Sequence, residues 1–437
     1  MNSKLSLAGL ALVALLTSAP DAQTPGPEQF WHQWRGPYAN GISRHANPPT
    51  AWSEKQNIRW KVEIPGRGSA SPVVWGDRLF VLTAIPAGAS LSDSHTPRGG
   101  RTPELHRFVV MAIDRKTGRT IWERTAKEER PHEGSHPDNG TGASSSAVTD
   151  GEHVVAFFES RGLFVYDMDG KPIWQKDLGD KQMRSEFGEG STPALYRNRV
   201  VVVWDHQGQS FVVALDKRTG KELWRVERRE IDSWSTPLVV EHEGRAQVVT
   251  NGMNLLRSYD LETGQIVWQS DGTTMNPIPS PVAGDGMVFV TSGFRGNDLK
   301  AIRLAGARGD ITRSNNIVWS LNRDTPYVSS PLLYDGILYL IKSNSGILST
   351  FDARTGKPHY QLQRLAGLPE VFSSPVGAAG RVYLTGRDGT TLVIRHGPKF
   401  EVLGTNSLDD GFDASPALVD NEMYLRGYKY LYSIGPK

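Results

Sequence analysis

The chain has 437 residues, with 49 basic and 47 acidic side chains and a net charge of +2. Because basic and acidic side chains are nearly equal in number, the charge gives no reason to expect nucleic acid as a partner. The printed sequence contains no cysteine, which excludes disulfides, a covalently attached c-type haem and a lipid-modified cysteine.

The first 22 residues have the pattern of a secretory signal peptide. Met1 to Lys4 carries one positive charge, Leu5 to Leu16 is apolar, and Thr17 to Gln23 is small and polar. An apolar core of about a dozen residues is too short to span a bilayer as a helix. We expect export to the periplasm or the exterior and no transmembrane segment in the mature chain; an uncleaved anchor is the alternative.

Residues 23–56 show no strand alternation. They are rich in Gly, Pro and Asn, yet they contain Phe30, Trp31, Trp34 and Trp52. Such aromatic density predicts an N-terminal arm that packs against the rest of the protein, in preference to a free tail or a ligand-binding segment.

A short motif recurs through residues 57–437. It is Ser-Pro or Thr-Pro, with Ala147 replacing proline in one copy, and its successive copies are 41 to 50 residues apart except for one gap of 75. Each copy opens a unit of short β-rich runs separated by glycine turns, as in Ser235 to Trp268. This period predicts one four-stranded antiparallel blade per copy, and a single domain.

Each unit closes on an aromatic residue. The series is Trp60, Trp122, Trp174, Trp224, Trp268, Trp319, Tyr360 and Phe400. Asp-x-x-Thr-Gly turns precede several of these residues, and their glycines can supply the positive φ of a tight hairpin. We interpret the aromatic rings as packing between neighbouring blades.

The two ends of the repeat region complement each other. The last unit offers three strands and then ends, whereas Asn57 to Val62 is a strand-like run with no unit of its own. Adding the strand around Trp60 to the C-terminal blade would leave no exposed sheet edge. The sequence therefore predicts an all-β, eight-bladed β-propeller closed by its N-terminal strand.

Propeller geometry also predicts where a ligand would bind. The segment before each Ser-Pro and the second loop of each blade share one face, around the mouth of the central channel. Insertions at 86–107 and 128–141 enlarge this face. The candidate ligand-binding residues are Asn139, Glu189, Asp205, Gln209, Trp234, Asn276, Arg295, Arg387, Asp413 and Arg426.

One segment matches a metalloprotease pattern. His132 to His136 reads His-Glu-Gly-Ser-His, but this zinc chemistry requires a helix that brings both imidazoles onto one face. Pro131, Gly134 and Pro137 disfavour a helix, so we expect no metal site there. Two carboxylate pairs, Glu186 with Glu189 and Asp410 with Asp413, match acid–base or calcium chemistry only by spacing.

A family resemblance rests on the repeats. Ala214 to Trp224 resembles the tryptophan-docking repeat of the pyrroloquinoline-quinone-like propeller superfamily. Trp34 to Pro37 and Trp204 to Phe211 further resemble exported bacterial propellers of this group. The resemblance covers the chain from Trp31 onward, and the superfamily includes quinoprotein dehydrogenases and an outer-membrane β-barrel assembly lipoprotein.

The departures from the family bear on function. Quinoprotein alcohol dehydrogenases of this type hold the quinone between a tryptophan and a disulfide, beside bound calcium. This chain has no cysteine and is much shorter than those enzymes. No motif supplies the metal ligands, so no catalytic residue is carried over, and Trp234 is the candidate floor for a quinone. The assembly lipoprotein needs a lipid-bearing cysteine that is also missing.

These observations lead to three hypotheses. The first is a monomeric, non-catalytic scaffold that binds a protein or peptide of the cell envelope through the mouth of the channel. The alternative is an oxidoreductase that binds pyrroloquinoline quinone, with calcium. A carbohydrate-active hydrolase that uses the paired carboxylates is the third.

Overall fold

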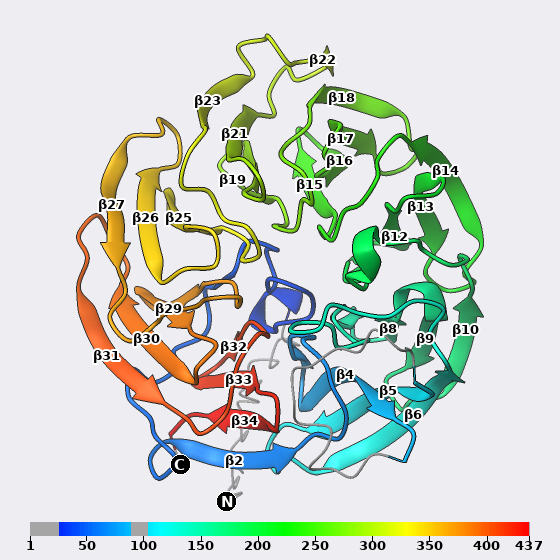
Figure 1. Cartoon of the computed structure of the whole chain (residues 1–437), viewed down its shortest axis with the longest axis vertical. Helices are drawn as coiled ribbons and strands as arrows, with labels where there is room; N and C mark the ends of the chain where they lie inside the picture. The colour runs from blue at the N-terminus through cyan, green and yellow to red at the C-terminus, as the bar shows by residue number, and fades with distance from the viewer. Residues whose placement is uncertain (1–25, 89–103, 437) are drawn as a thin grey trace, which may run out of the picture.

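The computed structural model describes residues 26–88 and 104–436. The predicted signal peptide, the start of the arm and most of the insertion at 86–107 lie outside these residues. Eight antiparallel β-sheets surround a central channel (Figure 1), which confirms the predicted all-β, eight-bladed propeller. No helix in the described part of the chain is long and apolar enough to cross a membrane.

The blades are numbered from the first complete sheet, and the strands of each blade are given from the innermost, next to the channel, to the outermost. Blade 1 contains β3 (Val73–Trp75), β4 (Arg78–Pro86), β5 (His106–Asp114) and β6 (Thr120–Glu129); blade 2 contains β7 (Val148–Thr149), β8 (His153–Phe157), β9 (Leu163–Asp167) and β10 (Pro172–Lys176); blade 3 contains β11 (Ala194–Tyr196), β12 (Arg199–Trp204), β13 (Ser210–Asp216) and β14 (Glu222–Arg228); blade 4 contains β15 (Leu238–His242), β16 (Arg245–Thr250), β17 (Leu255–Asp260) and β18 (Ile266–Asp271).

The second half of the ring repeats the plan. Blade 5 contains β19 (Val282–Gly284), β20 (Met287–Ser292), β21 (Asp298–Arg303) and β23 (Ile317–Leu321); blade 6 contains β24 (Leu332–Tyr334), β25 (Ile337–Ile341), β26 (Ile347–Asp352) and β27 (Pro358–Arg364); blade 7 contains β28 (Val376–Ala378), β29 (Arg381–Thr385), β30 (Thr390–Arg395) and β31 (Val402–Ser407); blade 8 contains β32 (Ala417–Val419), β33 (Glu422–Arg426), β34 (Tyr430–Ile434) and β2 (Ile58–Glu63). Two short strands, β1 (Ile42–Ser43) and β22 (Gly309–Asp310), pair in parallel with β28 and β18. The loops contain the 3-10 helices η1 (Pro27–Gln29), η3 (Glu159–Arg161) and η4 (Arg184–Glu186).

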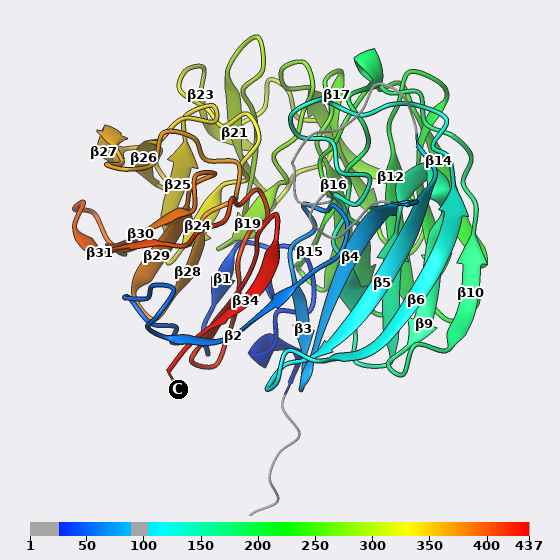
Figure 2. The same cartoon turned by 60° about the horizontal axis from the view of Figure 1, so that its bottom comes forward.

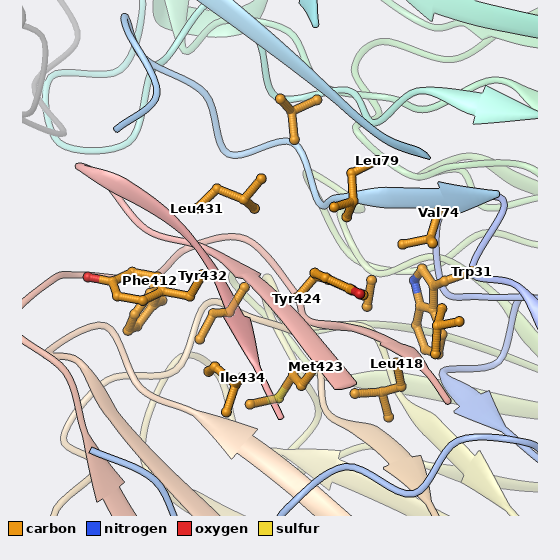
Figure 3. Close-up of a cluster of buried hydrophobic side chains, with 14 of the residues drawn as sticks. Trp31, Val74, Leu79, Phe412, Leu418, Met423, Tyr424, Leu431, Tyr432 and Ile434 are labelled. Carbon is orange, nitrogen blue, oxygen red and sulfur yellow. The ribbon is translucent and has the colours of Figure 1, made fainter. Parts of the chain in front are cut away.

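Blade 8 closes the ring as predicted. Strand β2 pairs antiparallel with β34, and Trp60 lies opposite Ser433 while Glu63 lies opposite Tyr430. Side chains of β32, β33 and β34 enter a buried cluster that also contains Trp31 of the arm (Figure 3). Strands from the two ends of the repeat region, β2 and β34, therefore share one sheet, and the arm shares its core.

The Ser-Pro motif has a structural role that the sequence analysis did not identify. In every blade, the backbone N–H of the motif's Ser or Thr donates to the hydroxyl oxygen of the corresponding Ser or Thr in the next blade. The eight bonds, 2.8–3.2 Å long, form a closed ring in the order Ser71, Ser146, Thr192, Thr236, Ser280, Ser330, Ser374, Ser415 and back to Ser71. We call these residues the hydroxyl ring. It satisfies eight backbone N–H groups that lie beyond the ends of the strands.

The predicted aromatic packing is present at most junctions between blades. The indole Nε1 of five tryptophans (60, 122, 174, 224 and 319) donates to a backbone carbonyl of the next blade at 2.8–2.9 Å. A glycine of that next blade lies against each indole; at Gly220, for example, φ is +69° and an added Cβ would lie 2.7 Å from Trp174. The turn glycines therefore serve both the hairpin and the approach of the tryptophan.

The arm crosses the end of the channel opposite the mouth, where Figure 2 shows it in dark blue near the lower end of the ring. Backbone bonds join it to the innermost strands of blades 1, 2, 6 and 7, through Val74, Thr149, Leu333 and Gly377. Strand β1 then lies along β28 before the chain leaves the channel beside blade 7. The arm thus ties together blades that are far apart in the sequence.

The junction between blades 7 and 8 differs from the prediction. Gly404 pairs with Val393 at the position that a docking tryptophan takes in other blades, whereas Phe400 packs on Tyr360 at the junction between blades 6 and 7. Trp52 of the arm, which is 4% exposed, occupies the wedge between blades 7 and 8 instead, with its ring centroid 6.4 Å from that of Tyr383. The assignment of Phe400 as the eighth closing aromatic is therefore wrong, because the aromatic ring comes from another segment.

Candidate functional site: a cavity in the central channel

A cavity of about 600 Å³ lies in the channel, between the arm and the mouth. The hydroxyl ring contributes Thr192, Thr236, Ser280, Ser330, Ser374 and Ser415 to its wall. Trp34 of the arm forms its floor and donates from Nε1 to the Ser280 hydroxyl at 3.1 Å. The volume lies within the range of small-ligand sites, and the floor places the entrance on the predicted face.

Arg35 holds the floor in position. Its side chain is 1% exposed, and its guanidinium donates to the carbonyl oxygens of Pro331 and Pro375, each at 2.7 Å. Burial lowers the pKa of Arg35 to about 9. Because these carbonyls belong to blades 6 and 7, the guanidinium locks the arm, and with it Trp34, onto the ring.

One wall carries a buried ion pair from blade 2. Glu159, in η3 with a φ of +55°, places Oε2 2.5 Å from Lys181 Nζ, and its Oε1 accepts from the Ser145 hydroxyl at 3.0 Å and from the Ser191 N–H. Burial raises the pKa of Glu159, and Lys181 opposes that shift. Lys181 is 1% exposed, so Glu159 lines the cavity while its counter-charge lies behind it.

Glu189 is held beside this pair. Its Oε1 accepts from the Ser160 hydroxyl at 2.7 Å and from Arg161 Nη1 at 2.9 Å, and its Oε2 accepts from the Ser160 N–H at 2.8 Å. Charge-assisted bonds of this kind fix the carboxylate in one orientation. The wall therefore presents positioned carboxylates.

A second ion pair lies across the channel. Asp413 Oδ1 is 3.1 Å from Arg387 Nε, and Arg387 Nη2 donates to Asn139 Oδ1 at 2.7 Å. The guanidinium also covers the ring of Phe372 at 4.4 Å. Burial raises the pKa of Asp413, and the charge of Arg387 opposes that shift. Arg387 thus fastens the insertion at 128–141, through Asn139, to blades 7 and 8.

Aromatic side chains complete the wall. Trp234 donates from Nε1 to the Gly188 carbonyl at 2.8 Å, and Tyr327 stacks on Phe294 with centroids 4.9 Å apart. Asn276 lies among them at a φ of +53° and is 2% exposed. Its Oδ1 accepts no hydrogen bond within the described residues. A buried acceptor without a donor carries a free-energy cost that a ligand could relieve.

Six of the ten predicted residues come together here. Asn139, Glu189, Trp234, Asn276 and Asp413 line the cavity, and Arg387 is bonded to two of them. They come from segments between residues 139 and 413, which the ring brings around one channel.

The other four are placed elsewhere. Asp205 is fully buried in a bidentate pair with Arg228, at 2.7 and 2.9 Å. Arg426 is 2% exposed and donates to the Leu82 carbonyl, and burial lowers its pKa to about 10. Gln209 and Arg295 are exposed on loops that do not line the cavity. The prediction selected loops, but the direction of each side chain decides whether it faces the channel.

Some residues of the cavity escaped the sequence analysis. Glu159 lies in the second loop of blade 2, so the rule that assigned second loops to the mouth could also have selected it. Lys181 offered no such signal, because a lysine in a connecting segment is ordinarily solvated.

The metalloprotease pattern has no zinc geometry. Residues 132–136 form no helix; His132 Nε2 donates to the Lys181 carbonyl at 2.6 Å, whereas the ring of His136 lies 5.1 Å from that of Phe187. Glu133 accepts from the Met183 N–H. The segment instead forms part of the cavity wall.

The remaining acidic clusters have structural partners. Asp410 accepts backbone N–H groups of Gly411 at 2.8 Å and Tyr430 at 3.0 Å. Among the described residues, the group of possible metal ligands is Asp150, Glu152 and His153, and Lys217 Nζ lies 2.5 Å from Asp150.

Known proteins resemble this chain along most of its length. The family model described as "Outer membrane protein assembly factor BamB" matches residues 106–253 and 252–399. The BamB of Burkholderia pseudomallei is 26% identical over 353 residues, which is 76% of each chain. The structure of BamB from Moraxella catarrhalis covers 87% of this chain and 97% of its own at 13% identity and a TM-score of 0.60. The quinohemoprotein alcohol dehydrogenase of Comamonas testosteroni covers 94% and 81% at 12% identity and a TM-score of 0.65. These structural likenesses show the fold, and the match of the family model shows that the chain belongs to the BamB-type family of pyrroloquinoline-quinone-like propellers.

Proposed function

We propose that this protein is an exported, non-catalytic binding module of the bacterial cell envelope, which holds a protein or peptide partner at the mouth of its central channel. The cavity carries the proposal. Glu159, Glu189 and Asp413 line it, and each is engaged by a cation or several donors of the chain itself. Carboxylates held in this way suit a rigid recognition surface better than proton transfer.

Membership of the family supports the same conclusion. The name of the matching family describes assembly of outer membrane proteins, and work of this kind requires contact with other proteins. The floor formed by Trp34 and the ring of eight hydrogen bonds make the mouth a preorganised surface, and preorganisation lowers the entropic cost of binding.

A quinone cofactor fits this cavity poorly. Pyrroloquinoline quinone carries three carboxylates, and the cavity lining contains five carboxylates and two guanidinium groups: Glu104, Glu133, Glu159, Glu189 and Asp413, with Arg67 and Arg161. An anionic ligand would be repelled by this surface. The oxygens of Glu159 and Glu189 are also engaged by donors of the chain, which leaves them poorly suited to hold calcium. We therefore do not propose the dehydrogenase.

Photo-crosslinking tests the proposed function. A photoreactive amino acid replaces Tyr327, which lines the cavity, or Arg218, an exposed turn residue next to Thr219 on the opposite face. We expect the first variant to crosslink one reproducible partner from a periplasmic extract, and the purified partner then to bind the unmodified protein with a measurable Kd.

Two results would contradict the proposal. One is equal crosslinking from both faces, which would place binding outside the cavity. The other is reduction of a dye in the presence of pyrroloquinoline quinone, calcium and an alcohol, which would show the dehydrogenase activity.

A further inference from the structure

Two carboxylates of the cavity wall face the channel while the cations that balance them lie outside the lining. Glu159 and Asp413 line the cavity, whereas their partners Lys181 and Arg387 do not. Lys181 is 1% exposed and lies under the ring of Trp204, with Nζ 4.8 Å from the centroid. A ligand in the channel therefore meets the carboxylates first, in a site where burial strengthens electrostatic interactions.

One buried oxygen atom in the lining has no hydrogen-bond donor in the part of the chain that the structure describes, and another belongs to a buried ion pair. Asn276 Oδ1 accepts no hydrogen bond among the described residues. Asp413 Oδ1 lies 3.1 Å from Arg387 Nε, and Asp413 Oδ2 accepts from Arg387 Nη2 at 3.3 Å. Both residues are more than nine-tenths buried. An acceptor in this state is satisfied by a ligand that brings N–H groups, and not by another acceptor.

The aromatic lining fits the same chemistry. Phe158, Phe187, Trp234, Tyr327 and Phe372 line the cavity. Phe372 already holds the guanidinium of Arg387 at 4.4 Å from its ring centroid. Aromatic faces attract ammonium and guanidinium groups, and the attraction grows where water is excluded.

We propose that the cavity binds a basic segment of the partner, with a lysine ammonium or arginine guanidinium that enters the channel between Asp413, Asn276 and the aromatic wall. This inference rests on the proposed function and names the chemistry of its ligand. The cavity of about 600 Å³ is larger than one side chain, so the flanking residues of the segment also fit within the mouth.

Titration calorimetry with three probes tests the inference. The probes are a hexapeptide containing two lysines and two arginines, a peptide of the same length with glutamates in their place, and free spermidine. We expect the basic peptide to bind, with an affinity that falls as salt screens the charges. The acidic peptide should not bind.

Matched variants locate the site. Asp413→Asn removes the buried charge and should weaken the basic peptide by about tenfold, the size expected for one charge-assisted hydrogen bond. Glu133→Gln should weaken it by about threefold, because its charge is less buried. Glu227→Gln makes the same change on an exposed position of β14, outside the cavity, and should leave the affinity unchanged. Thermal unfolding of each variant checks that it is folded.

The outcomes separate this inference from the proposed function. A partner or acidic peptide that binds at the mouth regardless of Asp413→Asn and Glu133→Gln would overturn the inference and leave the binding module intact. Spermidine could instead bind as tightly as the basic peptide and respond in the same way to both variants. This result would support a cationic ligand but would identify it as a free amine, and so would contradict the proposed peptide partner.

Discussion

The junction between blades 3 and 4 and the junction between blades 7 and 8 solve one packing problem in two ways. In the first, Trp224 comes from the outer strand of blade 3, donates to the Leu261 carbonyl and lies over Gly264. In the second, the outer strand has Gly404, and Trp52 arrives from the N-terminal arm. The wedge between blades requires an aromatic ring, but the ring need not belong to either blade.

The junction between blades 7 and 8 also holds the N-terminal arm in place. The Tyr383 hydroxyl donates to the Pro48 carbonyl at 2.9 Å, and Asn406 exchanges hydrogen bonds with the arm at Thr50 and Trp52. The same arm supplies Trp34, the floor of the cavity. The irregular junction therefore couples the stability of the ring to the shape of its site.

The largest expected effect comes from Trp52→Ala. Truncation of a nearly buried tryptophan should lower the free energy of unfolding by about 3–5 kcal/mol, measured by denaturant titration. Trp224→Ala is the matched substitution at a regular junction and should lower the free energy of unfolding by a similar amount. Trp52→Ala alone should also make the arm sensitive to limited proteolysis. Equal proteolysis of the two variants would show that Trp52 does not anchor the arm.

Gly404→Ala should have an intermediate effect. The added Cβ would lie 2.4 Å from the Thr50 carbonyl oxygen, so the arm must shift at a cost of about 1–3 kcal/mol. In a protein that already carries Trp52→Ala, the cost should be smaller, because the arm is then free to move. Additive costs in the double variant would mean that Gly404 acts without the arm.

The smallest expected effect concerns the regular turns. The Thr117 hydroxyl, 2.7 Å from Asp114 Oδ1, holds the pKa of that carboxyl below its usual value of 3.8, and Thr355 does the same for Asp352. A depressed folded-state pKa adds stability that is complete above the unfolded pKa and is lost as the pH falls below it.

Asp114→Asn with Asp352→Asn should therefore flatten the fall in stability below about pH 4, where the wild-type carboxylates take up protons. Chemical denaturation at a series of pH values from 2 to 6 measures this change, and Asp169→Asn, the same substitution at an exposed turn position of blade 2, is the control. An unchanged slope in the double variant would argue against these turns as a source of acid sensitivity.

The fold was predictable because its signals are local and repeated. Proline punctuation and closing aromatics recur in each blade, so eight imperfect copies support one another, and the unpaired strand around Trp60 indicated the closure. The site was predictable only in part. Loop position identified Glu189, Trp234 and Asp413, but the same rule also selected Asp205, whose side chain turns inward to Arg228.

The sequence by itself determined the number of blades, their order and the strand that closes the ring, since each depends on spacing along the chain. Only the tertiary structure decided that Trp52 fills the wedge beside Gly404, from which it is separated by more than three hundred residues of sequence. The tertiary structure also decided that Lys181 lies behind Glu159 while the carboxylate of Glu159 faces the channel. Which side chains contact one another depends on their direction and on long-range packing, and a local sequence pattern determines neither of these.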